Sequence, residues 1–238
     1  MLAIVLAAAV PLASQSAAPS PVPRYEIKRA DTPIVVDGKL DDAAWASASA
    51  PVALQFFWES QTGAKQKTLA RMLWDDQALY LCFDAQDADI TGQRTERDSA
   101  VYLDDALEIF INPNPAQEVL YYGFETNVRG AVYDYLNYNE RTFFKRWDAT
   151  GMKIATSVRG TLNVRTDTDE GWSLEASIPW ANFEELARKP TVGAIWKANI
   201  NRWDGVEPNR RMSEWSDPVQ RTPWPHGAAR FGELVFVK

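Results

Sequence analysis

The stretch VYLDDALEIFINP, residues 101–113, places an acidic loop directly before an apolar strand. Within ALEIFI, Leu107, Ile109 and Ile111 share one face and Glu108 takes the other, because successive side chains of a strand point to opposite faces. Asp105 has the parity of the apolar face, so we expect its carboxylate to accept hydrogen bonds from loop amides. The pattern predicts a strand with one buried face.

The same period-two alternation recurs along the chain, and clusters of turn-forming residues such as NPNP and TDTDEG separate the segments. LDDAAW (40–45) and PWANFEELA (179–187) are typical of short helices. The expected strands cover residues 79–83, 106–111, 119–127, 152–158, 172–178, 196–203 and 233–237. These features predict an all-β fold, an antiparallel β-sandwich with one or two short helices.

The first residues are typical of an exported protein. An apolar run, Leu2–Val10, precedes a stretch rich in small residues, and it is too short to span a bilayer. We expect a signal peptide at 1–18, a Pro-rich linker at 19–24 and a single domain at 25–238. The expected location is therefore secreted or periplasmic.

The chain has 238 residues, of which 46% are hydrophobic, and a formal net charge of −7. That composition is sufficient for a substantial core. Dispersed basic residues and a negative field disfavour nucleic acids and anionic membrane surfaces as partners. We expect a monomer that binds a neutral or cationic ligand.

Few residues are available for catalysis or for zinc. His226 is the single histidine and Cys82 the single cysteine, which disfavours nucleophilic triads and His/Cys zinc sites. A glycosidase needs two carboxyl groups about 5 to 9.5 Å apart. Asp104 and Glu108 would lie roughly 13 Å apart in an extended strand. A glycoside hydrolase with carboxylates from separate strands stays an open alternative.

Two further binding possibilities follow from single residues and loops. His226 with Met152 or Met212 could supply the axial ligands of a haem-binding sandwich domain. The acidic loops DAQDADI (84–90) and TDTDEG (166–171) could hold a structural calcium ion, since calcium prefers oxygen ligands. Neither loop has the EF-hand pattern, and solvated turns are the other interpretation.

Three of the expected strands carry short polar side chains on the face opposite their apolar residues: Glu108, Glu125, Asn127, Asn199 and Asn201. Amides and carboxylates of this kind hydrogen-bond sugar hydroxyls, which both donate and accept. An ordinary solvated sheet face is the alternative.

From Ile27 to Lys238 the chain resembles the family 9 carbohydrate-binding modules, secreted β-sandwich domains of polysaccharide-degrading systems. The motifs that carry this resemblance, in order, are TPIVVDGKLDDAAW, ARMLWDDQALYLCF, DDALEIFINP, YYGFETNVRG, GWSLEASIPW, SEWSDP and RFGELVFVK. The resemblance implies a non-catalytic module, without a required cofactor, that clamps a terminal sugar of a glucan or xylan chain between two aromatic rings.

Carried over by motif position, the resemblance places the two rings at Tyr102 and Trp224. It places the polar contacts at the residues Glu108, Asn199, Arg210, Arg211 and Gln220. Two departures stand out: Tyr102 replaces the usual tryptophan, and Glu125 replaces an arginine, which inverts the local charge. If Tyr102 and Glu108 line one pocket, the chain must bend at LDD, since six extended residues span about 20 Å.

Overall fold

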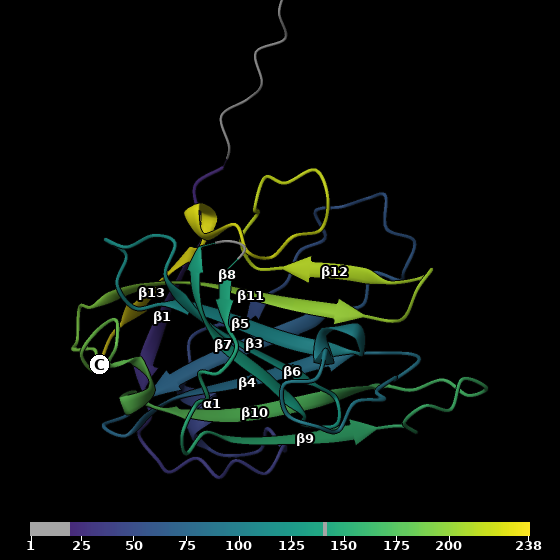
Figure 1. The fold of residues 1–238 in the computed structure, drawn as a ribbon. Coiled ribbons are helices and arrows are strands. Elements are labelled where there is room, and N and C mark those ends of the chain that lie inside the picture. The colour runs from purple at the N-terminus through teal and green to yellow at the C-terminus, as the bar shows by residue number, and fades with distance from the viewer. Residues whose placement is uncertain (1–19, 140–141) are drawn as a thin grey trace, which may run out of the picture.

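Two β-sheets face each other in the computed structural model, which describes residues 20–139 and 142–238 (Figure 1). The predicted signal peptide, 1–18, lies outside the described residues. In the described part of the chain, no helix has the length and apolar character that crossing a membrane requires.

The first sheet is built around the strand of the opening stretch, β5 (Ala106–Asn112). On one side of β5 lie β6 (Tyr121–Asn127), β7 (Val132–Asn139) and β8 (Thr142–Phe144). On its other side lies β11 (Ile195–Asp204), which pairs with both β12 (Arg211–Glu214) and β13 (Gly232–Phe236). All these ladders are antiparallel.

The second sheet has the order β3 (Thr68–Trp74), β4 (Ala78–Gln86), β10 (Gly171–Pro179) and β9 (Lys153–Arg159). A short strand, β2 (Val52–Ala53), pairs with β3. These ladders are also antiparallel. The all-β sandwich expected from the sequence is confirmed.

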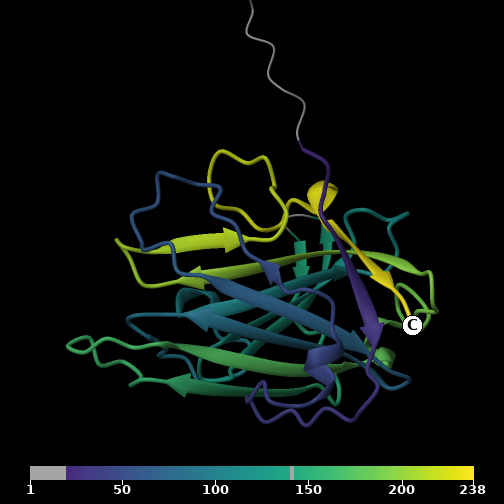
Figure 2. The same ribbon diagram turned by 180° about the vertical axis from the view of Figure 1, so that it is seen from behind.

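One strand, β1 (Arg24–Arg29), belongs to both sheets. Residues 24–27 pair with β13, whereas residues 28 and 29 pair with β3, and both pairings are parallel. Figure 2 shows β1 and β13 side by side in purple and yellow. The sandwich is thus antiparallel, as predicted, except for the two pairings of this strand.

The core lies between the sheets. It contains Leu107, Ile109 and Ile111 of β5, as the alternation predicted, and indole rings from both sheets, among them Trp74 and Trp196. Trp180 contacts both of these rings edge-on, at centroid distances of 6.4 and 5.9 Å. Edge-to-face packing suits the charge distribution of aromatic rings. The opposite face of β5 is left for other groups.

The helical segments are shorter than predicted. The first, α1, covers Ala44–Ser47 and starts near the end of LDDAAW. In PWANFEELA only a 3-10 turn forms, η2 (Trp180–Phe183). Isolated helices of this length are marginal, and here Trp180 and Phe183 insert into the core while Asn182 binds the carbonyls of Thr150 and Pro179. Tertiary contacts thus fix a tight turn instead of an α-helix.

Candidate functional site

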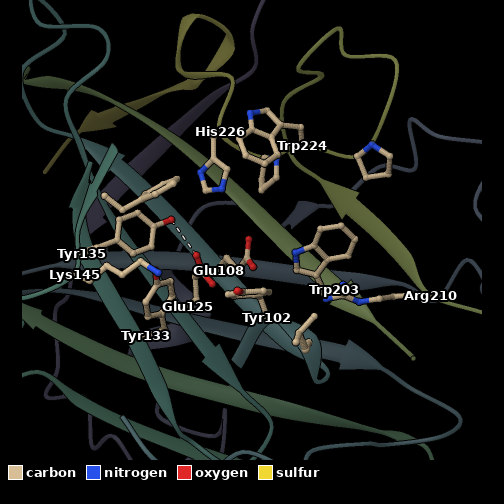
Figure 3. Close-up of a pocket in the computed structure, with 14 residues that line it drawn as sticks. Tyr102, Glu108, Glu125, Tyr133, Tyr135, Lys145, Trp203, Arg210, Trp224 and His226 are labelled. Carbon is tan, nitrogen blue, oxygen red and sulfur yellow. Dashed lines mark hydrogen bonds between the residues drawn. The ribbon is translucent and has the colours of Figure 1, made fainter. Parts of the chain in front are cut away.

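A cavity of about 400 Å³ opens on the face of the first sheet that points away from the core. Side chains from β5, β6, β7 and β8 form its floor and one side, and residues 223–226 form the other side. A 3-10 turn, η1 (Val101–Leu103), supplies a further wall just before β5. Figure 3 shows the cavity with its labelled residues.

A row of polar side chains crosses four strands, and two of its members, Glu108 and Glu125, line the floor of the cavity. Glu108 of β5 lies directly opposite Glu125 of β6 and, on its other side, opposite Asn201 of β11. Asn201 in turn lies opposite Glu214 of β12. Directly opposed residues share one face of a sheet, so these four side chains form a line. All four are buried; the face is therefore covered, not solvated.

The wall that carries Tyr102 depends on the bend before β5. Asp104 follows η1 and accepts hydrogen bonds from the backbone N–H and guanidinium of Arg94, at 2.9 and 2.5 Å, and from the Asn127 amide at 2.8 Å. These contacts turn the chain, so that Tyr102, 36% exposed, lines the same cavity as Glu108. The bend that the sequence required is present at LDD.

Asp105, one residue further, binds loop amides as expected. One carboxylate oxygen accepts from the backbone N–H of Thr91 at 2.5 Å and from its hydroxyl at 3.0 Å. The other accepts from the N–H of Gly205 at 2.6 Å. Burial raises the pKa of Asp105 to about 8, with the charges of Asp87 and Asp204 adding to the effect. Its role in the bend is structural.

The opposite wall carries Trp224, which rests on His226. The His226 ring stacks on Phe110 with centroids 4.9 Å apart, and its Nδ1 lies 2.7 Å from the Tyr121 hydroxyl. Trp224 meets His226 edge-on at 4.7 Å. Burial lowers the pKa of His226 to about 3, so the ring is neutral at physiological pH. His226 is thus an uncharged support for the Trp224 wall.

The carboxyl groups of this polar row have strongly shifted pKa values. Burial raises the pKa of Glu108 to about 8. The pKa values of Glu125 and Glu214 lie well above their ordinary range, chiefly through burial and also through repulsion by Glu108. Tyr135 donates to one oxygen of Glu125 at 2.9 Å, the dashed line in Figure 3. Each glutamate keeps one oxygen, Oε2, without a hydrogen-bond partner among the described residues.

A cationic side chain also lines the cavity. The Arg210 guanidinium lies over the Trp203 ring, 4.0 Å from its centroid. Its Nε and Nη2 are buried without a hydrogen-bond partner in the described part of the chain. Burial lowers the pKa of Arg210, while the nearby Glu108 raises it. The cavity therefore holds both free acceptors and free donors.

Five of the eight predicted site residues line the cavity: Tyr102, Glu108, Glu125, Arg210 and Trp224.

The other three predicted residues have contacts elsewhere. Asn199 is buried and accepts from the N–H groups of Ile200 and Ser216, each at 3.0 Å. Arg211 is buried against the loop before β3, where it donates to three carbonyls. Gln220 is exposed, and its carbonyl accepts from the Trp58 indole at 3.0 Å. These residues support the structure around the cavity without lining it.

The sequence analysis overlooked the aromatic residues of β7. Tyr133 and Tyr135 line the cavity, together with Lys145 and Trp203. The alternation in VYDYLNY (132–138) would have indicated this strand and placed both tyrosines on one face. Lys145 directly follows β8, and no local sequence pattern indicates that it lines the cavity.

Two groups of aspartates could hold a metal ion. Asp87, Asp105 and Asp204 are all buried, with carboxylate oxygens within 4.8 Å of one another. The second group is Asp98, Asp134 and Asp148.

In each of the two groups, an arginine forms salt bridges with two of the aspartates. The buried Arg202 pairs with Asp87 at 2.9 Å and with Asp204 at 2.8 Å, and Arg97 pairs with two aspartates of the second group. In TDTDEG, Asp169 accepts from backbone N–H groups at 2.7 and 2.9 Å, as a turn residue does.

The haem alternative is not favoured. His226 lines the cavity, but Met152 and Met212 do not. Met152 packs against the core cluster between the sheets, and Met212 is fully buried in β12. The His226 Nδ1 is engaged with Tyr121.

Comparisons with known proteins identify the family and the fold. A family model described as carbohydrate family 9 binding domain-like matches residues 36–238. The exoglucanase XynX of Acetivibrio thermocellus is 27% identical over 203 residues, which are 84% of this chain. The chain spans only 16% of the length of that relative.

Solved structures share the fold. A candidate carbohydrate-binding protein from Bacteroides uniformis has a TM-score of 0.76 at 19% identity, over 90% of this chain and 99% of the other. A family 9 carbohydrate-binding module from Caldicellulosiruptor kristjanssonii, in complex with cellotriose, has a TM-score of 0.63 at 18% identity, over 90% and 93%. A structure of a family 9 module from the same organism in complex with glucose has a TM-score of 0.61 at 18% identity, over 90% of this chain and 95% of the other.

Proposed function

The chain belongs to the carbohydrate family 9 binding domains and is a carbohydrate-binding module, and we propose that it clamps the end of a glucan or xylan chain between Tyr102 and Trp224. The observation that carries this proposal is the placement of the two rings. They come from segments more than a hundred residues apart and lie on either side of Glu108 in one cavity (Figure 3).

The chemistry of the cavity suits a sugar. Aromatic faces pack against the apolar faces of a pyranose ring. A sugar hydroxyl both donates and accepts, so it can donate to the free oxygen of Glu108 and accept from the free N–H groups of Arg210. A buried polar group without a hydrogen-bond partner costs free energy. A sugar that supplies these partners removes that cost. Sugars in which both contacts form should bind most tightly.

The clamp is tested by titration calorimetry with cello- and xylo-oligosaccharides. We expect Tyr102→Ala and Trp224→Ala each to weaken binding about tenfold or more, since lost stacking costs on the order of 1.4 kcal/mol. Phe144→Ala is the matched control, because Phe144 is 44% exposed and does not line the cavity. If all three variants bind like the wild type, the rings are not a clamp.

We further propose that the module is non-catalytic. Hydrolysis needs two carboxyl groups that flank the scissile bond, one of them ionised. Glu108 and Glu125 lie side by side on adjacent strands, and the pKa of each is raised. We expect no new reducing ends when the protein is incubated with the oligosaccharides it binds. Turnover that disappears in Glu108→Gln would instead support a hydrolase.

We propose an exported protein that assists polysaccharide breakdown. Two observations support this proposal: the first residues are typical of a signal peptide, and a matched curated relative is an exoglucanase.

A further inference from the structure

The carboxyl groups of Glu108 and Glu125 form a close pair on the cavity floor. The two residues are directly opposed on neighbouring antiparallel strands, and opposed residues have Cβ atoms roughly 5 Å apart. Glu108 is 1% exposed and Glu125 4% exposed. Each has one oxygen with no hydrogen-bond partner in the described structure, and both residues line the cavity. Two free acceptors therefore meet at one place.

Among the described residues, neither of these carboxyl groups forms a salt bridge, although Arg210 lies near Glu108 and Lys145 near Glu125. The Arg210 guanidinium lies over Trp203, and the Lys145 amine lies over the Tyr133 ring at 5.2 Å. Both cations attract the pair, but neither forms a salt bridge with it. The other titratable groups near the pair are acidic or uncharged: Tyr102, Tyr133, Tyr135 and His226, which line the cavity, and Glu214, which is repelled by Glu108.

Such a pair is stable only with a proton or with a cationic group beside it, because two like charges at this distance repel strongly when buried. A sugar hydroxyl can donate one hydrogen bond and brings no charge. An ammonium group donates up to three hydrogen bonds and brings a positive charge. Aromatic faces such as those of Tyr102 and Tyr133 also attract cations. An ammonium group thus satisfies the pair better than a hydroxyl.

We propose that the cavity prefers a sugar unit that carries a free amino group, with the ammonium between Glu108 and Glu125. A glucosamine unit of a fully deacetylated chitin oligosaccharide has this chemistry. This inference rests on the proposed function, since it specifies the sugar that the same cavity binds. Glu125 is then the specificity-determining residue, and an N-acetylated sugar, which lacks the charge, gains nothing from the pair.

The test compares three trisaccharides by titration calorimetry at pH 6.0: cellotriose, the glucosamine trimer and the N-acetylglucosamine trimer. We expect the glucosamine trimer to bind at least tenfold more tightly than cellotriose. Its binding should also release protons, seen as an enthalpy that depends on the ionisation enthalpy of the buffer. The preference should persist in 0.5 M NaCl, because salt screens a buried pair less than surface charges.

Two Glu→Gln variants locate the effect. Glu125→Gln should reduce the preference for the glucosamine trimer over cellotriose to within twofold. Glu118→Gln is the same substitution at an exposed site outside the cavity and should leave the preference unchanged. Circular dichroism checks that both variants fold. If Glu125→Gln does not fold, the proposal is decided by the wild-type protein alone, from its affinities for the glucosamine trimer and cellotriose and from the proton release.

The outcomes separate this inference from the proposed function. If cellotriose binds as tightly as the glucosamine trimer, or if the two variants behave alike, the amino-sugar preference is overturned and sugar binding stands. If none of the trimers and no xylo-oligosaccharide binds, the proposed function fails and this inference with it.

Discussion

Arg211 illustrates how a residue near a binding site can serve the fold instead. Its guanidinium is buried and donates to the carbonyls of Trp58, Gln61 and Gly63, which holds the loop between β2 and β3. Arg210, the preceding residue, stacks on Trp203 and lines the cavity. Arg210 lies just before β12 and Arg211 is its first residue, and the contacts of the two side chains give these neighbouring arginines separate roles.

We expect Arg211→Met to lower the free energy of unfolding by about 2 to 4 kcal/mol, because three buried carbonyls lose their charged donor. Urea unfolding measures this change. Arg221→Met is the control, since Arg221 is exposed, and it should have little effect. Oligosaccharide affinity should stay within about twofold of the wild type; a large loss in Arg211→Met would mean that this residue contacts the ligand.

Alternation predicted the face of single residues but not what covers that face. Leu107 and Glu108 point to opposite sides of β5, as expected. Asn199 also points away from the core, yet β12 and the chain after it cover the amide. The groups that contact a side chain come from segments distant in the sequence. The alternation within one strand gives no information about those segments.

At the level of strands, β6 and β7 fit together through a glycine. Gly123 lies opposite Tyr135, and a Cβ at position 123 would come within 2.2 Å of the Tyr135 ring. The missing side chain lets that ring lie across β6, where its hydroxyl donates to Glu125. Gly123 thus positions one side of the cavity without touching a ligand.

We expect Gly123→Ala to displace Tyr135, to lower the free energy of unfolding by about 1 to 3 kcal/mol, and to weaken oligosaccharide binding. Chemical denaturation and titration calorimetry measure the two effects. Gly130→Ala is the control. A Cβ at position 130 meets nothing within 4 Å, and the only strain comes from the positive φ of this residue. We expect this variant to be less stable than the wild type but to bind oligosaccharides with the same affinity. Unchanged binding in Gly123→Ala would show that the position of Tyr135 is irrelevant.

The strands with clear alternation were predicted within a few residues, among them β4, β5, β10 and β11. Strand β7 was not predicted, although its pattern is regular, and neither were β1 and β3. The helices were overestimated, because LDDAAW and PWANFEELA have favourable helix composition, whereas buried residues such as Trp45, Trp180 and Phe183 fix shorter turns in their place. Short elements depend on tertiary contacts more than on propensity.

For the molecule as a whole, the buried acids make stability depend on pH. Between pH 7 and 9 a group such as Glu108, whose folded pKa is about 8, loses its proton in the folded state. The unfolded chain is already ionised there, so stability falls as pH rises. Below about pH 6.5 the lowered pKa of His226 acts in the opposite direction, since unfolding then binds a proton.

We expect the free energy of unfolding to fall by on the order of 2 kcal/mol from pH 7 to pH 9, as measured by urea denaturation. Glu125→Gln should make this slope shallower, because it removes one acid of the coupled row and its repulsion on Glu108. Glu118→Gln, at an exposed position, should not. Stability that rises over this interval would contradict the raised pKa values.

The sandwich as a whole followed from the sequence, but the strand that joins the two sheets did not. The partners of β1 are β13, about two hundred residues away, and β3, and no local pattern specifies a parallel pairing with either.

That joining strand determines how the domain carries mechanical load. The two strands β1 and β13 run parallel and are hydrogen-bonded to each other, so Arg24 and Phe236 lie at opposite ends of one ladder. A pull on these two residues shears the ladder along its length, and its hydrogen bonds must break together instead of one after another. The β1–β13 ladder therefore resists a load applied through Arg24 and Phe236 better than a hairpin that opens one hydrogen bond at a time.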